Sequence, residues 1–379
     1  MKVSFRSCPS VASVIILGTG IAYCQDATTP ATPSPVQSSA PTVTQPARQL
    51  TPSPQDAANT ESNANKGQIR LRIVVTDASG KLVTGLTQDD FTVLDNHIAA
   101  KVTSFREAGG ANPTEPVQLI LVLDMLNNDP ENVVSERQQV EKFLGEYGGR
   151  LPIPVSIVLF SYSGAKINGP SRDGNFLIAN MRKMPNVISA IGAGGDYGAI
   201  DRWQRSLKVL NQLIAYGSTM PGRKVLVWIS PGWPSLTGNQ FRSNTKDKDE
   251  DWNWIISFTN HLREAGVTLY RLSAPSFGSS LYYSPVYKNF LKPVTNLKEA
   301  GSGNLALPVL ATQSGGLVLD DSNDLARRMA ICMDEATSYY SVSYTAPTPT
   351  LAKEYRPLEV KMAKPGEVAR TNSGYYAQP

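Results

Sequence analysis

The feature that most constrains the fold is the apolar run Val117–Leu123, which ends at Asp124. A strand that is apolar on both faces is typical of a parallel sheet covered by helices on either side. Ligands of such sheets bind beyond the carboxyl ends of the strands, and Asp124 occupies such an end. The amides Asn127 and Asn128 follow within a few residues, before a helical pattern begins. The run therefore predicts a buried central strand with a polar loop at its functional edge.

Strand and helix patterns alternate along the middle of the chain. Apolar, β-branched segments that predict further strands lie at 155–160, 224–229, 267–270 and 317–319. Apolar residues at three- and four-residue steps predict helices near 140–147, 200–214, 255–265 and 325–336. Residues 166–170 are expected to pair antiparallel at the sheet edge. This alternation predicts an α/β fold, a Rossmann-like, doubly wound, mostly parallel sheet.

Both ends of this α/β region are rich in short strand patterns. At the N-terminal side the expected strands are 69–77, 83–86, 91–94 and 100–105, with a hairpin tip at Asp95-Asn96-His97. At the C-terminal side they are 339–344, 355–361 and 374–376. Each set is too small to be stable alone, so we expect them to pack together as one antiparallel β unit.

These segments include Val75-Thr-Asp-Ala-Ser-Gly-Lys81, Gly85-Leu-Thr-Gln-Asp-Asp-Phe91, Tyr339-Tyr-Ser-Val-Ser-Tyr344 and Tyr355-Arg-Pro-Leu-Glu-Val-Lys361. Their sequences resemble the VWFA-related domain family of exported bacterial proteins, which has a von Willebrand factor A-like (vWA-like) fold. The resemblance implies a division into an N-terminal β unit at 67–112, a vWA-like domain at 113–338 and C-terminal strands at 339–379. The family is named for its fold, so the resemblance says little about activity.

In that fold three loops hold a divalent cation, and magnesium suits such oxygen ligands. The first-loop pattern Asp-x-Ser-x-Ser reads Asp124, Leu126 and Asn128 here. Asp196 lies in the second loop, and the third loop reads Ser230-Pro-Gly without the expected carboxylate. The resemblance thus implies a degenerate site of Asp124, Asn128, Asp196 and Ser230, to which Mg²⁺ or another divalent ion would bind weakly. The alternative is that Asp124 caps the following turn and that Asn127 and Asn128 bond to local backbone, so we expect no cofactor.

Two long loops leave the carboxyl ends of the expected strands 224–229 and 267–270. The first contains Trp233, and the second contains Tyr282, Tyr283 and Tyr287. Long loops in this place concentrate binding residues, and aromatic side chains favour recognition. We therefore predict a ligand-binding surface of Asp124, Asn127, Asn128, Asp196, Trp233, Tyr282 and Tyr283. The alternative is that the tyrosine-rich loop is a lid over its own core.

The N-terminal residues indicate export. Lys2 and Arg6 precede the apolar stretch 11–22 and the sequence Ala22-Tyr23-Cys24, which is typical of a bacterial signal peptide at 1–24. Cleavage after Cys24 and lipidation of Cys24 are both open, although Tyr23 disfavours a lipid anchor. Residues 25–66 are rich in Pro, Ser, Thr, Ala and Gln, a composition that predicts a disordered linker. We expect a periplasmic, cell-surface or secreted protein.

Signals for catalysis and for nucleic-acid binding are weak. The net charge of +4 is spread along the chain, and only His97 and His261 are present as histidines. No Gly-x-Ser-x-Gly or His-Glu-x-x-His motif occurs. With Cys8 inside the signal peptide and Cys332 inside a helical pattern, no intramolecular disulfide is expected.

These observations favour a non-enzymatic recognition or adhesion module for a protein, matrix or envelope ligand. One alternative is a hydrolase on a Rossmann-like scaffold with Asp124 and Asp196 as its acid and base. The other is a structural component of the envelope.

Overall fold

A computed structural model describes residues 67–109, 115–184, 195–234, 245–274, 285–320, 323–349 and 351–378. The expected signal peptide and linker lie outside these residues. Among the described residues, no helix combines the length and apolar content needed to cross a membrane.

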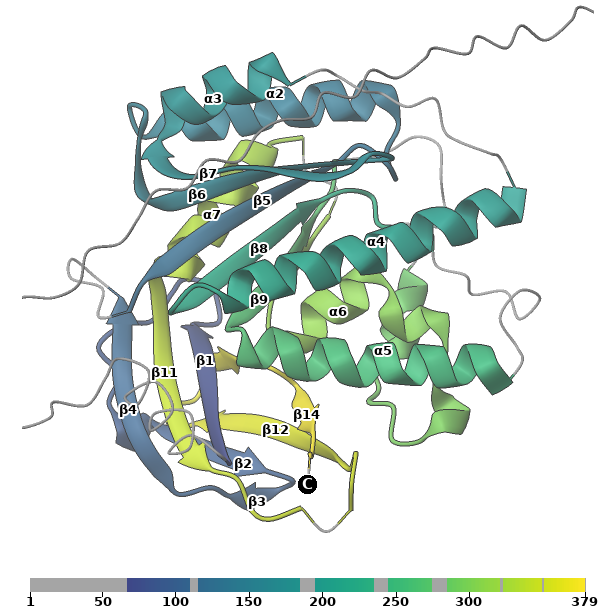
Figure 1. The fold of residues 1–379 in the computed structure, drawn as a ribbon. Coiled ribbons are helices and arrows are strands. Elements are labelled where there is room, and N and C mark those ends of the chain that lie inside the picture. The colour runs from purple at the N-terminus through teal and green to yellow at the C-terminus, as the bar shows by residue number, and fades with distance from the viewer. Residues whose placement is uncertain are drawn as a thin grey trace, which may run out of the picture. The chain divides into compact units, whose positions relative to one another are not determined.

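The centre of the described chain is a six-stranded sheet with the order β10-β9-β8-β5-β6-β7 (Figure 1). Its strands are β5 Val117–Asp124, β6 Arg150–Ser161, β7 Gly164–Asp173, β8 Arg223–Ile229, β9 Val267–Leu272 and β10 Val318–Leu319. Neighbouring strands are parallel except β7, which pairs antiparallel with β6. In chain order this is the 3-2-1-4-5-6 arrangement of a doubly wound fold. The predicted fold class and the antiparallel edge at 166–170 are therefore confirmed.

Helices cover both faces of this sheet (Figure 1). They are α2 Pro130–Glu146, α3 Gly174–Lys183, α4 Gly195–Ser218, α5 Thr245–Glu264, α6 Leu307–Gln313 and α7 Leu325–Thr337. Leu119 and Leu121 of β5 pack in the cluster formed with α2, α3 and α7. Ile120 and Val122 point to the opposite face and pack in the cluster formed with α4, α5 and α6. All eight residues of β5 are buried, as the two-faced apolar run predicted.

The two chain ends form two further four-stranded sheets, with the orders β13-β1-β11-β4 and β14-β12-β2-β3. The strands are β1 Gln68–Thr76, β2 Phe91–Asp95, β3 Ile98–Ala99, β4 Val102–Gly109, β11 Ser338–Thr345, β12 Tyr355–Met362, β13 Val368–Arg370 and β14 Gly374–Tyr376. β1 pairs antiparallel with β11, from Gln68 opposite Thr345 to Ile73 opposite Tyr340. Strands from both chain ends also share one apolar core. The expected antiparallel β unit of N- and C-terminal segments is thus present.

A single buried carboxylate links the two chain ends inside this β unit. Asp95, the last residue of β2, is 1% exposed. Its Oδ1 accepts a hydrogen bond from Arg356 Nε at 2.8 Å, and its Oδ2 accepts from the hydroxyls of Tyr344 and Tyr375, both at 2.8 Å. Three C-terminal side chains therefore satisfy one N-terminal aspartate.

Polar contacts join the β unit to the α/β region. Arg370 Nη2 of β13 lies 2.6 Å from Glu335 Oε1 of α7, and the Tyr270 hydroxyl of β9 donates to Glu335 Oε2 at 2.5 Å. Asn260 of α5 exchanges two hydrogen bonds with the backbone of Tyr376 in β14.

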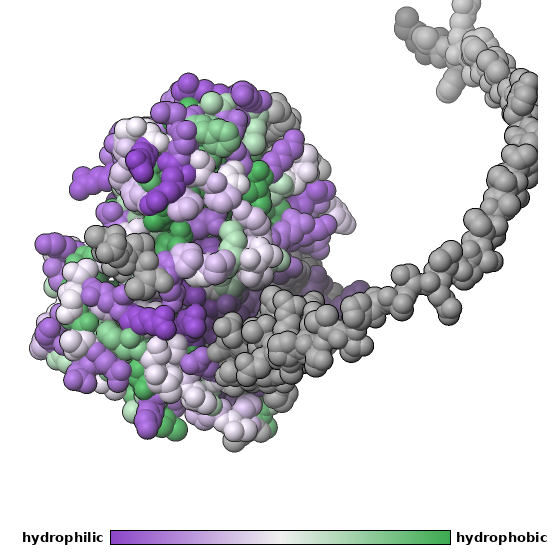
Figure 2. Space-filling model, turned by 60° about the vertical axis from the view of Figure 1, so that its left-hand side comes forward, coloured by the Kyte–Doolittle hydropathy of each residue, from purple (hydrophilic) through white to green (hydrophobic). Residues whose placement is uncertain are grey.

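Figure 2 shows mainly hydrophilic residues on one described face, with only small separate hydrophobic areas.

Several predicted elements differ from the structure. The expected strand 83–86 is wrong, since only the isolated bridge between Thr76 and Leu82 forms there, followed by the 3-10 helix η1 Gln88–Asp90. Helices α3 and α6 were not expected, and neither were the short 3-10 helices η2 Pro285–Phe290, η3 Leu297–Glu299 and η4 Ser302–Leu305. The hairpin tip is confirmed, because Asn96 and His97 have φ values of 49° and 67°, the left-handed conformation of a tight turn. Cys332 is buried in α7, as its apolar spacing predicted.

Candidate functional site

The candidate site is the edge of the central sheet where β5, β8, β9 and β10 end. β5 ends at Asp124, β8 at Ile229 before Ser230, and β10 at Leu319 before Asp320. Because these strands are parallel, their carboxyl ends meet along one edge, where ligands of doubly wound sheets bind. We refer to it as the carboxyl edge.

Asp124 is 1% exposed, and both of its oxygens are hydrogen-bonded within the protein. Oδ1 accepts from the backbone N–H groups of Leu126 at 3.0 Å and Asn127 at 2.9 Å. Oδ2 accepts from Asn127 Nδ2 and from the indole Nε1 of Trp228, both at 2.9 Å. Burial raises the pKa of Asp124, and these hydrogen bonds oppose that rise only in part. The structure therefore shows Asp124 capping the turn that follows it, as one of the two sequence hypotheses proposed.

The two amides next to Asp124 also have partners. Asn127 Nδ2 lies 2.9 Å from Ser206 Oγ of α4, which ties the loop to that helix. Asn128 Nδ2 donates to Glu136 Oε2 of α2 at 2.7 Å, and Asn128 Oδ1 accepts from the backbone of Asp129. Asn128 is therefore fixed to the first turns of α2, through Glu136 and through Asp129, which precedes the helix.

Glu136 is a component of the site that the sequence reasoning missed. It is 1% exposed, and burial raises its pKa to about 8, with the nearby Asp124 charge adding to the rise. Its Oε1 has no hydrogen-bond partner. A signal for it exists in the sequence, because Glu136 stands on the apolar stripe of Val133, Val140 and Phe143. A carboxylate on a buried stripe is uncommon unless it is paired or protonated.

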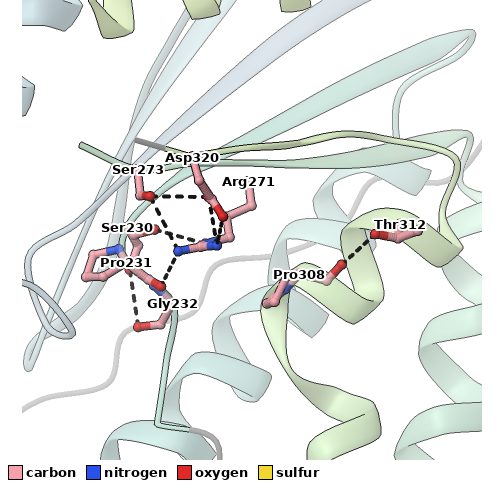
Figure 3. A network of polar contacts seen from close by, with 8 residues as sticks. All are labelled: Ser230, Pro231, Gly232, Arg271, Ser273, Pro308, Thr312 and Asp320. Carbon is pink, nitrogen blue, oxygen red and sulfur yellow. Dashed lines mark hydrogen bonds and ion pairs between the residues drawn. The ribbon is translucent and has the colours of Figure 1, made fainter. Parts of the chain in front are cut away.

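The third loop, which lacks a carboxylate, is occupied by an arginine (Figure 3). Arg271 of β9 is 1% exposed and pairs with Asp320, with 2.8 Å between Nη1 and Oδ1. Its guanidinium also donates to the carbonyl of Pro231 at 2.5 Å and to that of Ser230 at 3.4 Å. Ser273 Oγ bridges to Asp320 Oδ1 at 3.3 Å. Arg271 therefore ties the start of the loop after β8 to Asp320, which follows β10.

Arg271 and Asp320 were also missed, although Arg271 is the one charged residue in the strand Val267–Leu272. Tyr287 of η2 borders the same pair. Burial raises its pKa, Asp320 raises it further and Arg271 lowers it. Of the tyrosines expected in this loop, Tyr287 alone belongs to the described residues. Tyr282 and Tyr283 lie outside them.

We expected Trp233 to lie at the surface, but it is buried. It is 2% exposed, donates from Nε1 to the carbonyl of Leu305 at 3.0 Å, and packs edge-on against Trp228 with 4.9 Å between ring centroids. Its physical role here is to anchor the start of the loop into the core between α4, α5 and α6. Among the described aromatic residues, Tyr197 in the first turn of α4 is strongly exposed, at 88%.

The described oxygens do not fit a magnesium site. Each oxygen of Asp124 accepts two hydrogen bonds, Asn128 is engaged with Glu136, and Ser230 Oγ accepts from the backbone of Gly232 at 3.1 Å. Magnesium requires near-octahedral coordination by free oxygens. In the part of the chain that the structure describes, no three His, Cys, Asp or Glu residues form a metal-binding group. The side chain of Asp196, the remaining expected ligand, lies outside that part.

The sequence matches no family model and no curated protein. Solved structures with similar folds include an aerotolerance-related membrane protein from Bacteroides fragilis, 15% identical, with a TM-score of 0.32 over 58% of this chain and 98% of that one. A von Willebrand factor type A protein from Catenulispora acidiphila is 11% identical, with a TM-score of 0.33 over 76% of this chain and 73% of that one. The manganese-loaded TRAP protein of Plasmodium vivax is 13% identical, with a TM-score of 0.31 over 72% and 98%. Likenesses at this level assign no ligand and no activity to this chain.

Proposed function

We propose that this protein is an exported, non-enzymatic recognition module that binds a protein ligand at the carboxyl edge without a divalent cation. The observation that carries the proposal is the arrangement of charges there. Asp124 is fully hydrogen-bonded and buried, and Arg271, which contacts the start of the third loop, is paired with Asp320. A partner would therefore meet this edge through its surface side chains and not through a shared metal ion.

Two exposed side chains suit such contact. Tyr197 is 88% exposed at the start of α4, and Val286 is 42% exposed in η2 beside Tyr287, which borders the pair. Exposed aromatic and apolar side chains around a fixed polar centre are typical of protein-binding surfaces. Tyr282 and Tyr283 are proposed to belong to the same surface, together with Asp196, because their loops leave this edge. Trp233 would act indirectly by holding its loop in place.

Export and adhesion are the other parts of the proposal. The signal-peptide pattern at 1–24 supports export, and the linker composition at 25–66 supports a spacer between the folded region and the envelope.

The hydrolase alternative gains no support from Asp124, because all its lone pairs face internal donors and not a substrate. An acid or base must reach the proton that it transfers.

The proposal can be tested with a photo-crosslinking amino acid in the mature chain. The probe replaces Tyr197 in one variant and Gln212, which is exposed further along the same helix, in the control. Both are expressed in an exporting bacterium and irradiated with and without EDTA. We expect a discrete crosslinked protein from position 197 only, with a yield that EDTA does not change. Equal crosslinking at both positions would refute the binding surface, and loss of the product in EDTA would restore a metal-dependent site.

A further inference from the structure

A cavity without an assigned role lies away from the carboxyl edge, between the end of α5 and the β unit. Its volume is about 580 Å³, within the range of small-molecule sites. α5 ends at Glu264, just before β9 begins at Val267, so the cavity adjoins the amino ends of the parallel strands. Its wall combines Gln68, Arg263, Thr348, Tyr375 and Gln378 with prolines of the segment after β11.

Arg263 is the cation of this cavity, and its guanidinium is only partly used. The side chain is 9% exposed. Its Nη2 donates to Glu264 Oε1 at 2.9 Å, whereas its Nε is buried without a hydrogen-bond partner. A guanidinium can pair with the two oxygens of a carboxylate. Because Nε has almost no accessible surface, a ligand in the cavity would pair through Nη2, in exchange for Glu264.

The position of Arg263 is fixed by the β unit. Its Cζ lies 5.4 Å from the centroid of the Tyr375 ring, a cation–π contact. The Tyr375 hydroxyl donates to Asp95 at 2.8 Å, so the ring cannot turn freely. The guanidinium is therefore held in place before any ligand arrives, which reduces the entropy cost of binding.

Glu264 would compete with a ligand's carboxylate for the guanidinium of Arg263. It is 48% exposed and is the last residue of α5, where the helix dipole disfavours a negative charge. Its exchange for another carboxylate costs little, because Glu264 regains solvent when it leaves Arg263. Among the residues that line the cavity, Arg263 and Glu264 are the charged pair.

We infer that this cavity is a binding site for a small carboxylate-bearing molecule with a compact ring, in which Arg263 pairs with the carboxylate. The amides of Gln68 and Gln378 and the hydroxyl of Thr348 supply further polar contacts at the wall. Pro347 and Pro349 supply apolar surface for the ring. The site is independent of the recognition surface at the carboxyl edge.

The test is a titration of the full chain with benzoate, followed by ligand-observed NMR, with benzyl alcohol as the uncharged analogue. We expect benzoate to bind in the millimolar range and benzyl alcohol to bind at least about tenfold more weakly, because only the carboxylate pairs with Arg263. Arg263→Gln should weaken benzoate binding about tenfold, whereas Arg106→Gln on exposed β4 should leave it unchanged.

Glu264→Gln should change benzoate affinity in the opposite direction from Arg263→Gln. An unfolded variant could not bind benzoate more tightly. Removal of the competing carboxylate should tighten benzoate binding severalfold, with amide NMR spectra confirming that each variant keeps its fold. The inference fails if benzoate does not bind, if benzyl alcohol binds as tightly, or if Arg263→Gln and Glu264→Gln change the affinity in the same direction.

Discussion

Asp95 and Asp124 each end a strand and each is 1% exposed, yet their surroundings differ in charge. Asp95 forms an ion pair with Arg356 in addition to its two tyrosine hydrogen bonds. Asp124 receives hydrogen bonds from two backbone N–H groups, an amide and an indole, and within the described residues no cation pairs with it. Glu136 adds a second buried carboxyl group near Asp124.

This difference separates a structural centre from the edge that we propose binds a ligand. The Asp95 centre is neutralised and connects the two chain ends, so it contributes to folding. The carboxyl edge keeps two carboxyl groups whose ionised forms are disfavoured by burial. Perturbed groups of this kind concentrate at functional sites, although structural networks produce them as well. Four experiments test whether the two aspartates differ in this way.

The largest effect is expected for Asp95→Asn. It removes the close counter-charge of the buried Arg356 guanidinium and leaves only Glu354 at 4.0 Å, which costs about 3 to 5 kcal/mol of unfolding free energy. Urea denaturation of the full chain measures this cost. Adding Arg356→Met to Asp95→Asn should recover part of it, because both buried charges are then gone. A loss no larger than that of Asp124→Asn would remove the distinction between the two aspartates.

Asp124→Asn should cost less, about 1 to 3 kcal/mol. No cation is left unpaired, but the new amide group faces N–H donors of Asn127 or Trp228 and leaves them unsatisfied. The same urea titration gives the value. If this variant is instead more stable than the parent protein, the burial penalty of the ionised Asp124 outweighs its hydrogen bonds.

Glu136→Gln should change how stability depends on pH, by about 1 kcal/mol or more. The folded-state pKa of about 8 lies above the ordinary value of 4.5, so the folded protein holds a proton that the unfolded chain releases between these values. Stability of the parent protein should therefore fall as pH rises from 4.5 to about 8, and then level off. Thermal unfolding across this range should show a shallower decline in Glu136→Gln. An unchanged slope would mean that Glu136 ionises normally in the folded state.

The smallest effect is expected for magnesium, which would supply the counter-charge that Asp124 lacks. Since the oxygens near Asp124 are already engaged, millimolar Mg²⁺ should stay below its dissociation constant and stabilise the protein by less than about 0.4 kcal/mol. Melting temperatures with Mg²⁺ and with EDTA provide the measurement, and Asp124→Ala is the control. A rise of several degrees that Asp124→Ala abolishes would show a working metal site.

Much of the fold could be predicted because its signals are local. The apolar run of β5, the helical spacing on α2, α4, α5 and α7, and the turn residues at Asn96 and His97 each act over a few residues. The wrong strand at 83–86 and the missed helices α3 and α6 are short segments, where local preference decides little.

The candidate site could be predicted only in part. Asp124 was placed correctly at the end of a central strand, but the exposure of Trp233 was not, because the indole finds its partner at Leu305, far along the chain. Likewise, Arg271 gains its role only when β10 lies beside β9 and brings Asp320 within 2.8 Å.

Residue order alone was therefore enough to predict the alternation of strands and helices and the position of the carboxyl edge, because apolar periodicity is a property of neighbouring residues. The pairing of the two chain ends was predicted because each set of short strands is too small to be stable alone. Which polar groups at that edge are already satisfied, and which carboxyl group faces a cation, became clear only from the folded chain. Those outcomes depend on burial and on partners from distant segments, such as Trp228 for Asp124 and Arg356 for Asp95.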